Sequence, residues 1–273
     1  MRSRRPSITS TIGSAVLVPA LLAGCTNEVG TADDAGDPEP VAQLTVTVLE
    51  RYPTDPAAFT QGLELFDGQL YESTGQYGES DIRISDLETG EVVQLEPLPA
   101  EFFGEGLTIV DDSVWQLTWQ EGVAFRWDRD TLVEQEQVSY DGEGWGLCHD
   151  PERDRLVMSD GSAELTFRDP ETFEPTGSVE ITRDGEPQPM INELECVGDQ
   201  VWANIWLTDE IVRIDPARGV VEAVVDASGL LTEEEGVGAD VLNGIAAIPD
   251  TDTFLITGKL WPWLFEVRFD PAG

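Results

Sequence analysis

Five polar or aromatic side chains recur at one position of a repeated apolar segment, which makes them candidates for chemistry. The repeated segment reads Gly-Leu or a close variant, and the place of its glycine is called here the Gly-like position. The residues directly before that position are Gln61, Glu105, Trp145, Asn192 and Asn243. Three residues follow 14 to 16 positions after the second, fourth and fifth of these: Trp119, Trp206 and Lys259. One acid, one ammonium group, neutral amides and aromatic walls are typical of a site for a small molecule or a peptide end.

The composition removes most other chemistries. The 273 residues include 54 Asp and Glu against 15 Lys and Arg, three Cys, one His and one Lys, and the formal net charge is -39. This acidity excludes most nucleic-acid binders, which need a basic patch. Without HExxH or CxxC spacing, little is left for a zinc site or a Ser-His-Asp triad. We therefore expect no metal, no cofactor and no nucleic-acid partner, and proton transfer by a carboxyl group.

The elements that must position these residues are strands in a repeat. The Gly-Leu-like segments are 44, 40, 47 and 51 residues apart, and each is followed by two more β-rich runs, and in four units by a third. The last unit lacks its fourth strand. The run 44–49, which alternates like a strand, lies before the first unit and belongs to no unit. The pattern predicts an all-β, five-bladed β-propeller whose last blade is closed by the N-terminal strand. A sandwich and a six-bladed propeller are the alternatives.

The circular arrangement of the blades explains why equivalent residues of the repeat would form one site. The first strand of each propeller blade lines the central channel, so the five residues before the Gly-like positions would face one another at one mouth. The antiparallel second strands end at the same mouth, which adds Trp119, Trp206 and Lys259. Taken alone, Asn192 and Asn243 could equally cap turns. Trp115 and Trp202 alternate away from their neighbours and are predicted to be core residues.

The N-terminus resembles a bacterial lipoprotein signal. Residues 1–24 combine three arginines with an apolar stretch that ends in Leu-Ala-Gly before Cys25. We expect residues 1–24 to be cleaved, Cys25 to carry the lipid, 25–41 to be a flexible linker and 42–273 to form the propeller. The protein would then lie in the cell envelope, anchored by lipid on the outer side of the cytoplasmic membrane. An ordinary signal peptide with an incidental Cys is the alternative.

The motifs at these positions resemble the plant-type glutaminyl-peptide cyclotransferases, the glutaminyl cyclases shared by plants and bacteria. The matching segments lie in all five units: 59–62 (FTQG), 103–108 (FGEGLT), 143–147 (EGWGL), 159–161 (SDG), 191–195 (INELE), 202–206 (WANIW), 242–246 (LNGIA) and 257–259 (TGK). The resemblance implies a five-bladed propeller that cyclises N-terminal Gln to pyroglutamate with release of ammonia.

The resemblance also implies roles for residues. Glu105 would be the central acid, and the substrate would be surrounded by Phe59, Gln61, Phe103, Trp119, Trp145, Asn192, Trp206 and Lys259. We expect Glu105, Lys259 and Asn192 to be catalytic, and Asn243 to join the substrate-binding set through its ring position. Burial would raise the pKa of Glu105 and Lys259 would lower it, so the net direction stays open. The expected partners are peptides with N-terminal Gln, and the expected state is a monomer.

Two other functions remain as alternatives. A non-catalytic propeller could bind peptides or envelope glycans in the same cleft. A lactonase-like hydrolase would need several inward acids around a calcium ion, but the ring positions supply only one. The net charge favours neutral or basic peptides as substrates.

The two cysteines of the body, Cys148 and Cys196, stand two and three residues after their Gly-like positions. On paired inner strands these offsets would point the side chains to opposite faces. The sequence therefore predicts two free, buried thiols. The adjacent His149 lacks nearby partners for a metal.

Overall fold

The computed structural model describes residues 40–273, and every regular element among them is a β-strand. The predicted signal peptide 1–24, the lipid site Cys25 and nearly all of the linker 25–41 lie outside the described residues. Within 40–273 we find no helix of the length and apolarity that a membrane span requires.

Three antiparallel sheets of four strands follow one another along the chain. The first contains β2 (Thr60–Phe66), β3 (Gln69–Thr74), β4 (Asp81–Asp86) and β5 (Val92–Pro97). The second contains β6 (Gly104–Val110), β7 (Ser113–Thr118), β8 (Val123–Asp128) and β9 (Glu134–Ser139). The third contains β10 (Leu147–Asp150), β11 (Arg155–Met158), β12 (Glu164–Arg168) and β13 (Pro175–Glu180).

The remaining strands form a ten-stranded sheet from two antiparallel runs. One run is β16 (Ile191–Val197), β17 (Gln200–Ile205), β18 (Glu210–Asp215) and β19 (Val220–Asp226). The other is β20 (Leu242–Ala247), β21 (Thr253–Gly258), β22 (Trp263–Pro271) and β1 (Ala42–Pro53). A short hairpin of β14 (Thr182–Arg183) and β15 (Glu186–Pro187) attaches to β19.

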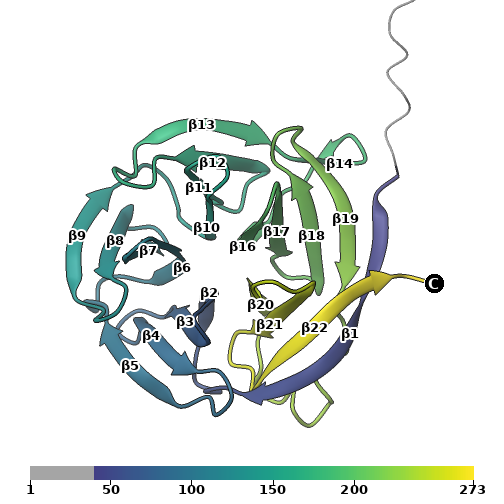
Figure 1. Cartoon of the computed structure of the whole chain (residues 1–273), viewed down its shortest axis with the longest axis horizontal. Helices are drawn as coiled ribbons and strands as arrows, with labels where there is room; N and C mark the ends of the chain where they lie inside the picture. The colour runs from purple at the N-terminus through teal and green to yellow at the C-terminus, as the bar shows by residue number, and fades with distance from the viewer. Residues whose placement is uncertain (1–39) are drawn as a thin grey trace, which may run out of the picture. The chain divides into compact units, whose positions relative to one another are not determined.

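The N-terminal strand closes the last run, as the sequence predicts. β1 pairs antiparallel with β22 from Leu44↔Pro271 to Pro53↔Trp263. It also pairs parallel with the C-terminal part of β19, over Ala42↔Ala223 to Thr45↔Asp226, a contact that the repeat pattern does not predict. One strand therefore ties the two last runs together (Figure 1).

The sheets are arranged around a central axis, with β2, β6, β10, β16 and β20 innermost and β5, β9, β13 and β19 outermost (Figure 1). Each inner strand contacts the next, and β20 contacts β2. The all-β class is confirmed, and the architecture is propeller-like.

Glycines let the inner strands approach one another. A Cβ at Gly62 would overlap the backbone of Leu107, one at Gly106 the backbone of Trp145 and Leu147, and one at Gly146 the backbone of Asn192. The repeated glycine of the sequence motif is therefore required by close contact between backbones around the axis.

The core lies between successive sheets. The cluster around Val157, Leu165, Leu194 and Val212 joins the third sheet to the β16–β19 run. Trp115 and Trp202 are buried in such clusters, as predicted for core residues. Because apolar side chains meet face to face from neighbouring sheets, burial fixes the sheets relative to one another and thereby the inner strands.

The prediction of free thiols is wrong. Cys148 on β10 and Cys196 on β16 form a disulfide, with their Cα atoms 5.5 Å apart. The prediction treated β10 and β16 as paired strands of one sheet, but they belong to two sheets that pack face to face. Between such sheets, side chains from opposite faces of their own strands point toward each other, so opposite offsets bring the two sulfurs together.

Candidate active site

A β-bulge recurs in four of the inner strands, at the predicted ring positions. The strand register shifts between Thr60 and Gly62, Gly104 and Leu107, Ile191 and Leu194, and Leu242 and Ile245. Gln61, Glu105, Asn192 and Asn243 lie inside these shifts. A bulge re-aims a side chain out of the regular alternation, so the repeat turns these side chains toward the axis.

The ring positions open into a cavity of about 330 Å³ at one mouth of the channel. Nine of the ten predicted catalytic or substrate-binding residues line it: Phe59, Gln61, Phe103, Glu105, Trp119, Trp145, Asn192, Trp206 and Lys259. Trp119, Trp206 and Lys259 come directly after β7, β17 and β21, so the ends of second strands do reach this mouth. Asn243 does not line the cavity and is fully buried behind Gln61.

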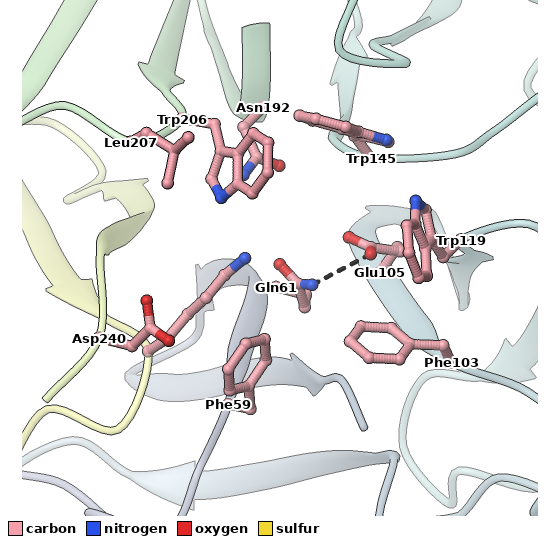
Figure 2. A pocket seen from close by; sticks show the side chains of 11 residues that line it. Phe59, Gln61, Phe103, Glu105, Trp119, Trp145, Asn192, Trp206, Leu207 and Asp240 are labelled. Carbon is pink, nitrogen blue, oxygen red and sulfur yellow. Dashed lines mark hydrogen bonds between the residues drawn. The ribbon is translucent and has the colours of Figure 1, made fainter. Parts of the chain in front are cut away.

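A chain of amides leads to the central carboxyl group. Nδ2 of Asn243 donates to Oε1 of Gln61 at 3.2 Å and to the carbonyl oxygen of Thr60 at 3.0 Å. Nε2 of Gln61 in turn donates to Oε1 of Glu105 at 3.0 Å (Figure 2). Because Asn243 occupies the oxygen of the Gln61 amide, the nitrogen of that amide faces Glu105.

Glu105 is only 5% exposed, and its charge state follows from that burial. Burial raises the pKa of Glu105 well above its ordinary value, Lys259 opposes the rise, and Glu143 and Glu121 add to it. The direction that the sequence left open is therefore upward. Burial also lowers the pKa of Lys259, against the attraction of Glu105 and Asp240.

Aromatic rings form the walls of the cavity (Figure 2). Phe103 makes edge contacts with Phe59 and Trp119 at centroid distances of 6.1 and 5.6 Å, and Trp145 packs edge-on against Trp206 at 5.3 Å. Nζ of Lys259 lies 4.9 Å from the centroid of the Phe59 ring, within range of a cation–π contact. Within these walls the polar groups at the centre are largely buried, with Glu105 and Lys259 each 5% exposed.

Asn192 offers an unused acceptor. Its main-chain oxygen accepts a hydrogen bond from Oγ of Ser159 at 2.6 Å, which fixes the backbone. Its side-chain oxygen Oδ1 is buried and has no partner among residues 40–273. A buried amide that is not fully hydrogen-bonded and lines a cavity is placed to bind a polar group of a ligand.

Comparison with known proteins identifies the family. A family model described as glutamine cyclotransferase matches residues 16–269. This chain belongs to the glutamine cyclotransferase family. A glutaminyl-peptide cyclotransferase of Arabidopsis thaliana is 38% identical over 234 residues, which is 84% of this chain and 72% of the relative. The crystal structure of Myxococcus xanthus glutaminyl cyclase is 40% identical, with a TM-score of 0.77, and the match covers 85% of this chain and 100% of that one.

Two further residues, Leu207 and Asp240, line the cavity, and the repeat pattern does not predict them. Leu207 follows Trp206 in a left-handed conformation, with φ of 65°, and is 64% exposed at the cavity. Asp240 comes from the connection between β19 and β20 and lines the cavity as well. The position of Leu207 next to Trp206 could have indicated it. Asp240 lies in a connection that has no equivalent position in the other repeat units, so the repeat could not indicate it.

Besides Glu105, the one acid at the predicted ring positions, three more carboxyl groups lie between the inner strands. Glu64 accepts from Ile109 N, Glu195 from Ala247 N, and Glu193 from Leu63 N and Ile245 N. Burial raises the pKa of all three carboxyl groups. Glu64 and Glu195 thus each bind the backbone of the next inner strand, and Glu193 binds the backbone of both β20 and β2, so all three contribute to holding the ring together. In the part of the chain that the structure describes, no cluster of three or more His, Cys, Asp or Glu side chains is arranged to hold a metal ion.

Proposed function

We propose that this chain is a five-bladed β-propeller glutaminyl-peptide cyclotransferase that converts N-terminal Gln to pyroglutamate and releases ammonia. The observation that carries the proposal is that a buried Glu105 and a buried Lys259 line the same aromatic-walled cavity. Family membership supports the same activity. The five-blade count is supported by five inner strands, each beginning one four-stranded antiparallel run.

The cavity suits the head of one residue at a peptide end. About 330 Å³ accommodates a small ligand, and the walls are largely aromatic with few polar groups. We place the α-amine and the γ-carboxamide of the N-terminal Gln near Glu105, with the remaining peptide leaving through the mouth. The partners are accordingly peptides and proteins with N-terminal Gln.

Glu105 moves the proton that the reaction must transfer. The neutral α-amine attacks the carbon of the γ-carboxamide, which forms the ring C–N bond. The ionised Glu105 takes the proton from the attacking nitrogen and returns it to the amide nitrogen, which leaves as ammonia when its C–N bond breaks. A carboxyl group whose pKa is raised toward the working pH transfers protons in both directions more effectively than an ordinary Glu.

Lys259 and Asn192 stabilise the oxygen on which negative charge develops. Nζ of Lys259 supplies a positive charge, and the amide nitrogen of Asn192 supplies a neutral donor. In comparable sites one such donor contributes roughly 3 to 4 kcal/mol to the barrier reduction. Gln61, held by Asn243, orients the reacting groups, and the Trp walls disfavour hydrolysis.

In the direct test, the protein is incubated with a peptide that begins with Gln, with and without a chelator. Mass spectrometry then follows the decrease in peptide mass by one ammonia molecule. The proposal requires turnover that the chelator leaves unchanged, because every step runs through side chains. A protein that only binds the peptide would release no ammonia.

Two variants test the roles. Glu105→Gln must lose turnover, and near-normal activity would remove the proton-transfer role. Lys259→Met must lower kcat, whereas an effect confined to KM would make Lys259 a wall residue only.

We propose separately that the protein is a monomer located in the cell envelope and held outside the cytoplasmic membrane by lipid on Cys25. The lipoprotein-like sequence supports it, as does the disulfide between Cys148 and Cys196, since disulfides persist in oxidising compartments. A Cys25→Ser variant should leave the membrane fraction, and light scattering of the soluble variant should give the mass of one chain.

A further inference from the structure

Glu143 lies outside the lining of the cavity, yet it contacts two of its walls. Its Oε2 accepts hydrogen bonds from Nε1 of Trp119 at 2.8 Å and from Nε1 of Trp145 at 3.0 Å. Its Oε1 accepts from Nε2 of Gln120 at 3.0 Å. The nitrogen-bearing ends of the two indoles lie next to each other in Figure 2, as a shared acceptor requires.

The two indoles come from different sheets, so the carboxylate is a bridge. Trp119 follows β7 of the second sheet, and Trp145 precedes β10 of the third. The backbone between them is held too: Gly144 N donates to the oxygen of Trp119, and Trp145 N to the oxygen of Ser159. A Cβ at Gly161 would overlap the Trp145 ring, so that ring is also packed from behind.

The hydrogen bonds keep Glu143 ionised. Burial acts to raise the pKa of Glu143, but donation from Trp145, Gln120 and Trp119 outweighs it and the pKa falls below its ordinary value. Hydrogen bonds to a carboxylate are stronger than those between neutral groups. The bridge is therefore a charged one at neutral pH.

We propose that Glu143 is a positioning residue for the cyclotransferase reaction, whose carboxylate clamps the indoles of Trp119 and Trp145 so that both rings keep their orientation against the substrate. This inference rests on the proposed function for its effect on catalysis, but the clamp itself can be observed without turnover. Its charge also acts on Glu105, together with Glu121 and against Lys259.

Two variants separate the geometry from the charge. Glu143→Gln keeps one oxygen for the two indole donors but removes the negative charge. Glu143→Ala removes both. Glu136→Gln is the matched control, since Glu136 is exposed on the neighbouring strand β9 and its side chain makes no hydrogen bond with residues 40–273.

The first measurement is a ¹H–¹⁵N spectrum of the tryptophan side chains, with the peaks assigned by Trp119→Phe and Trp145→Phe. Loss of a charged acceptor weakens the indole hydrogen bonds, so both peaks should move upfield in Glu143→Ala and less in Glu143→Gln. They should stay in place in Glu136→Gln. Peaks that stay in place in Glu143→Ala would overturn the clamp.

The second measurement is steady-state kinetics over a range of pH. We expect kcat/KM of Glu143→Ala to fall roughly 10- to 100-fold, because misplaced walls misorient the substrate. Glu143→Gln should stay within about threefold at its own optimum, since it retains the shared oxygen. The acid limb of its pH profile should move to lower pH, because a negative charge near Glu105 has gone.

The outcomes distinguish this inference from the proposed function. The inference would be overturned if Glu143→Gln and Glu143→Ala lost activity equally, in proportion to the loss of folded protein, and if the pH profile did not shift. Glu143 would then have a structural role only. A wild-type protein that releases no ammonia would overturn the proposed function, whereas the indole spectrum would still decide the clamp.

Discussion

Nε2 of Gln61 donates a hydrogen bond of 3.0 Å to Oε1 of Glu105, although 44 residues separate the two along the chain. The pair joins the inner strands of the first and second sheets at equivalent positions. Asn243 on β20 holds the other end of the Gln61 amide, so three inner strands contribute to one hydrogen-bonded chain. The central carboxyl group is thus oriented by the ring itself.

Asn243→Ala should lower kcat/KM about tenfold, although Asn243 does not line the cavity. Without its donor, the Gln61 amide is free to rotate and present its oxygen to Glu105, which costs roughly one charged hydrogen bond. The check is a double-mutant cycle with Gln61→Ala. In that background Asn243→Ala should cost almost nothing, whereas additive losses would show that Asn243 does not act through Gln61.

The pH profile should report the raised pKa of Glu105. The reaction needs the ionised carboxylate as base and the neutral α-amine of the substrate. The acid side of the kcat/KM profile should therefore contain two pKa values, that of the amine at about 7.7 to 8.0 and that of Glu105 well above the ordinary Glu value. Lys259→Met should move this acid limb to still higher pH, since Lys259 lowers the pKa of Glu105. A limb near the ordinary Glu value in the wild type would contradict the assignment of Glu105 as base.

Stability should fall as pH rises from 4.5 to 7, partly through Glu72. Burial raises the pKa of Glu72 from 4.5 to about 7, despite the opposing charge of Arg83 and a hydrogen bond from Thr60. The folded state then binds a proton that the unfolded state has lost, so Glu72 costs up to about 3 kcal/mol above pH 7.

Glu72→Gln keeps the acceptor for Thr60 and removes this cost. Its stability relative to the wild type should therefore increase across that pH range, as measured by urea unfolding at pH 5 and pH 8. Glu96→Gln, at an exposed position of β5, is the control and should show no such increase. A constant difference between Glu72→Gln and wild type at both pH values would refute the prediction.

The disulfide between Cys148 and Cys196 should contribute roughly 3 to 4 kcal/mol to stability, because it closes a loop of 48 residues in the unfolded chain. Urea unfolding of the Cys148→Ala/Cys196→Ala variant measures this loss. Reductant should bring the wild type to the level of the variant and leave the variant unchanged. Alkylation of Cys148 and Cys196 in the unfolded, unreduced protein would show that the disulfide does not form.

What the sequence could predict depended on the repeat. Gln61, Glu105, Asn192 and Asn243 sit at one position of the repeat, and a ring brings equivalent positions together, so spacing along the chain became proximity in space. Asp240 lies in a connection outside the repeat register, and its place required the structure. The disulfide was missed because its cysteines meet between two sheets. Glu143 stands in a matched motif, but only side-chain directions reveal that it joins two walls.

Peptides with a basic second residue should be better substrates than those with an acidic one. Asp240 lines the cavity, Glu121 contacts the backbone of Phe103 beside it, and the net charge of the chain is -39. Lys259 opposes this field, but it is only 5% exposed and lies inside the cavity, so it acts on the first residue rather than on the second.

At low salt we expect kcat/KM for Gln-Arg peptides to exceed that for Gln-Glu peptides about tenfold. At 1 M salt the Debye length falls to about 3 Å, so a preference set by the field should nearly vanish, and Asp240→Asn should reduce it at low salt. A preference that survives 1 M salt would instead come from direct contact with the second residue.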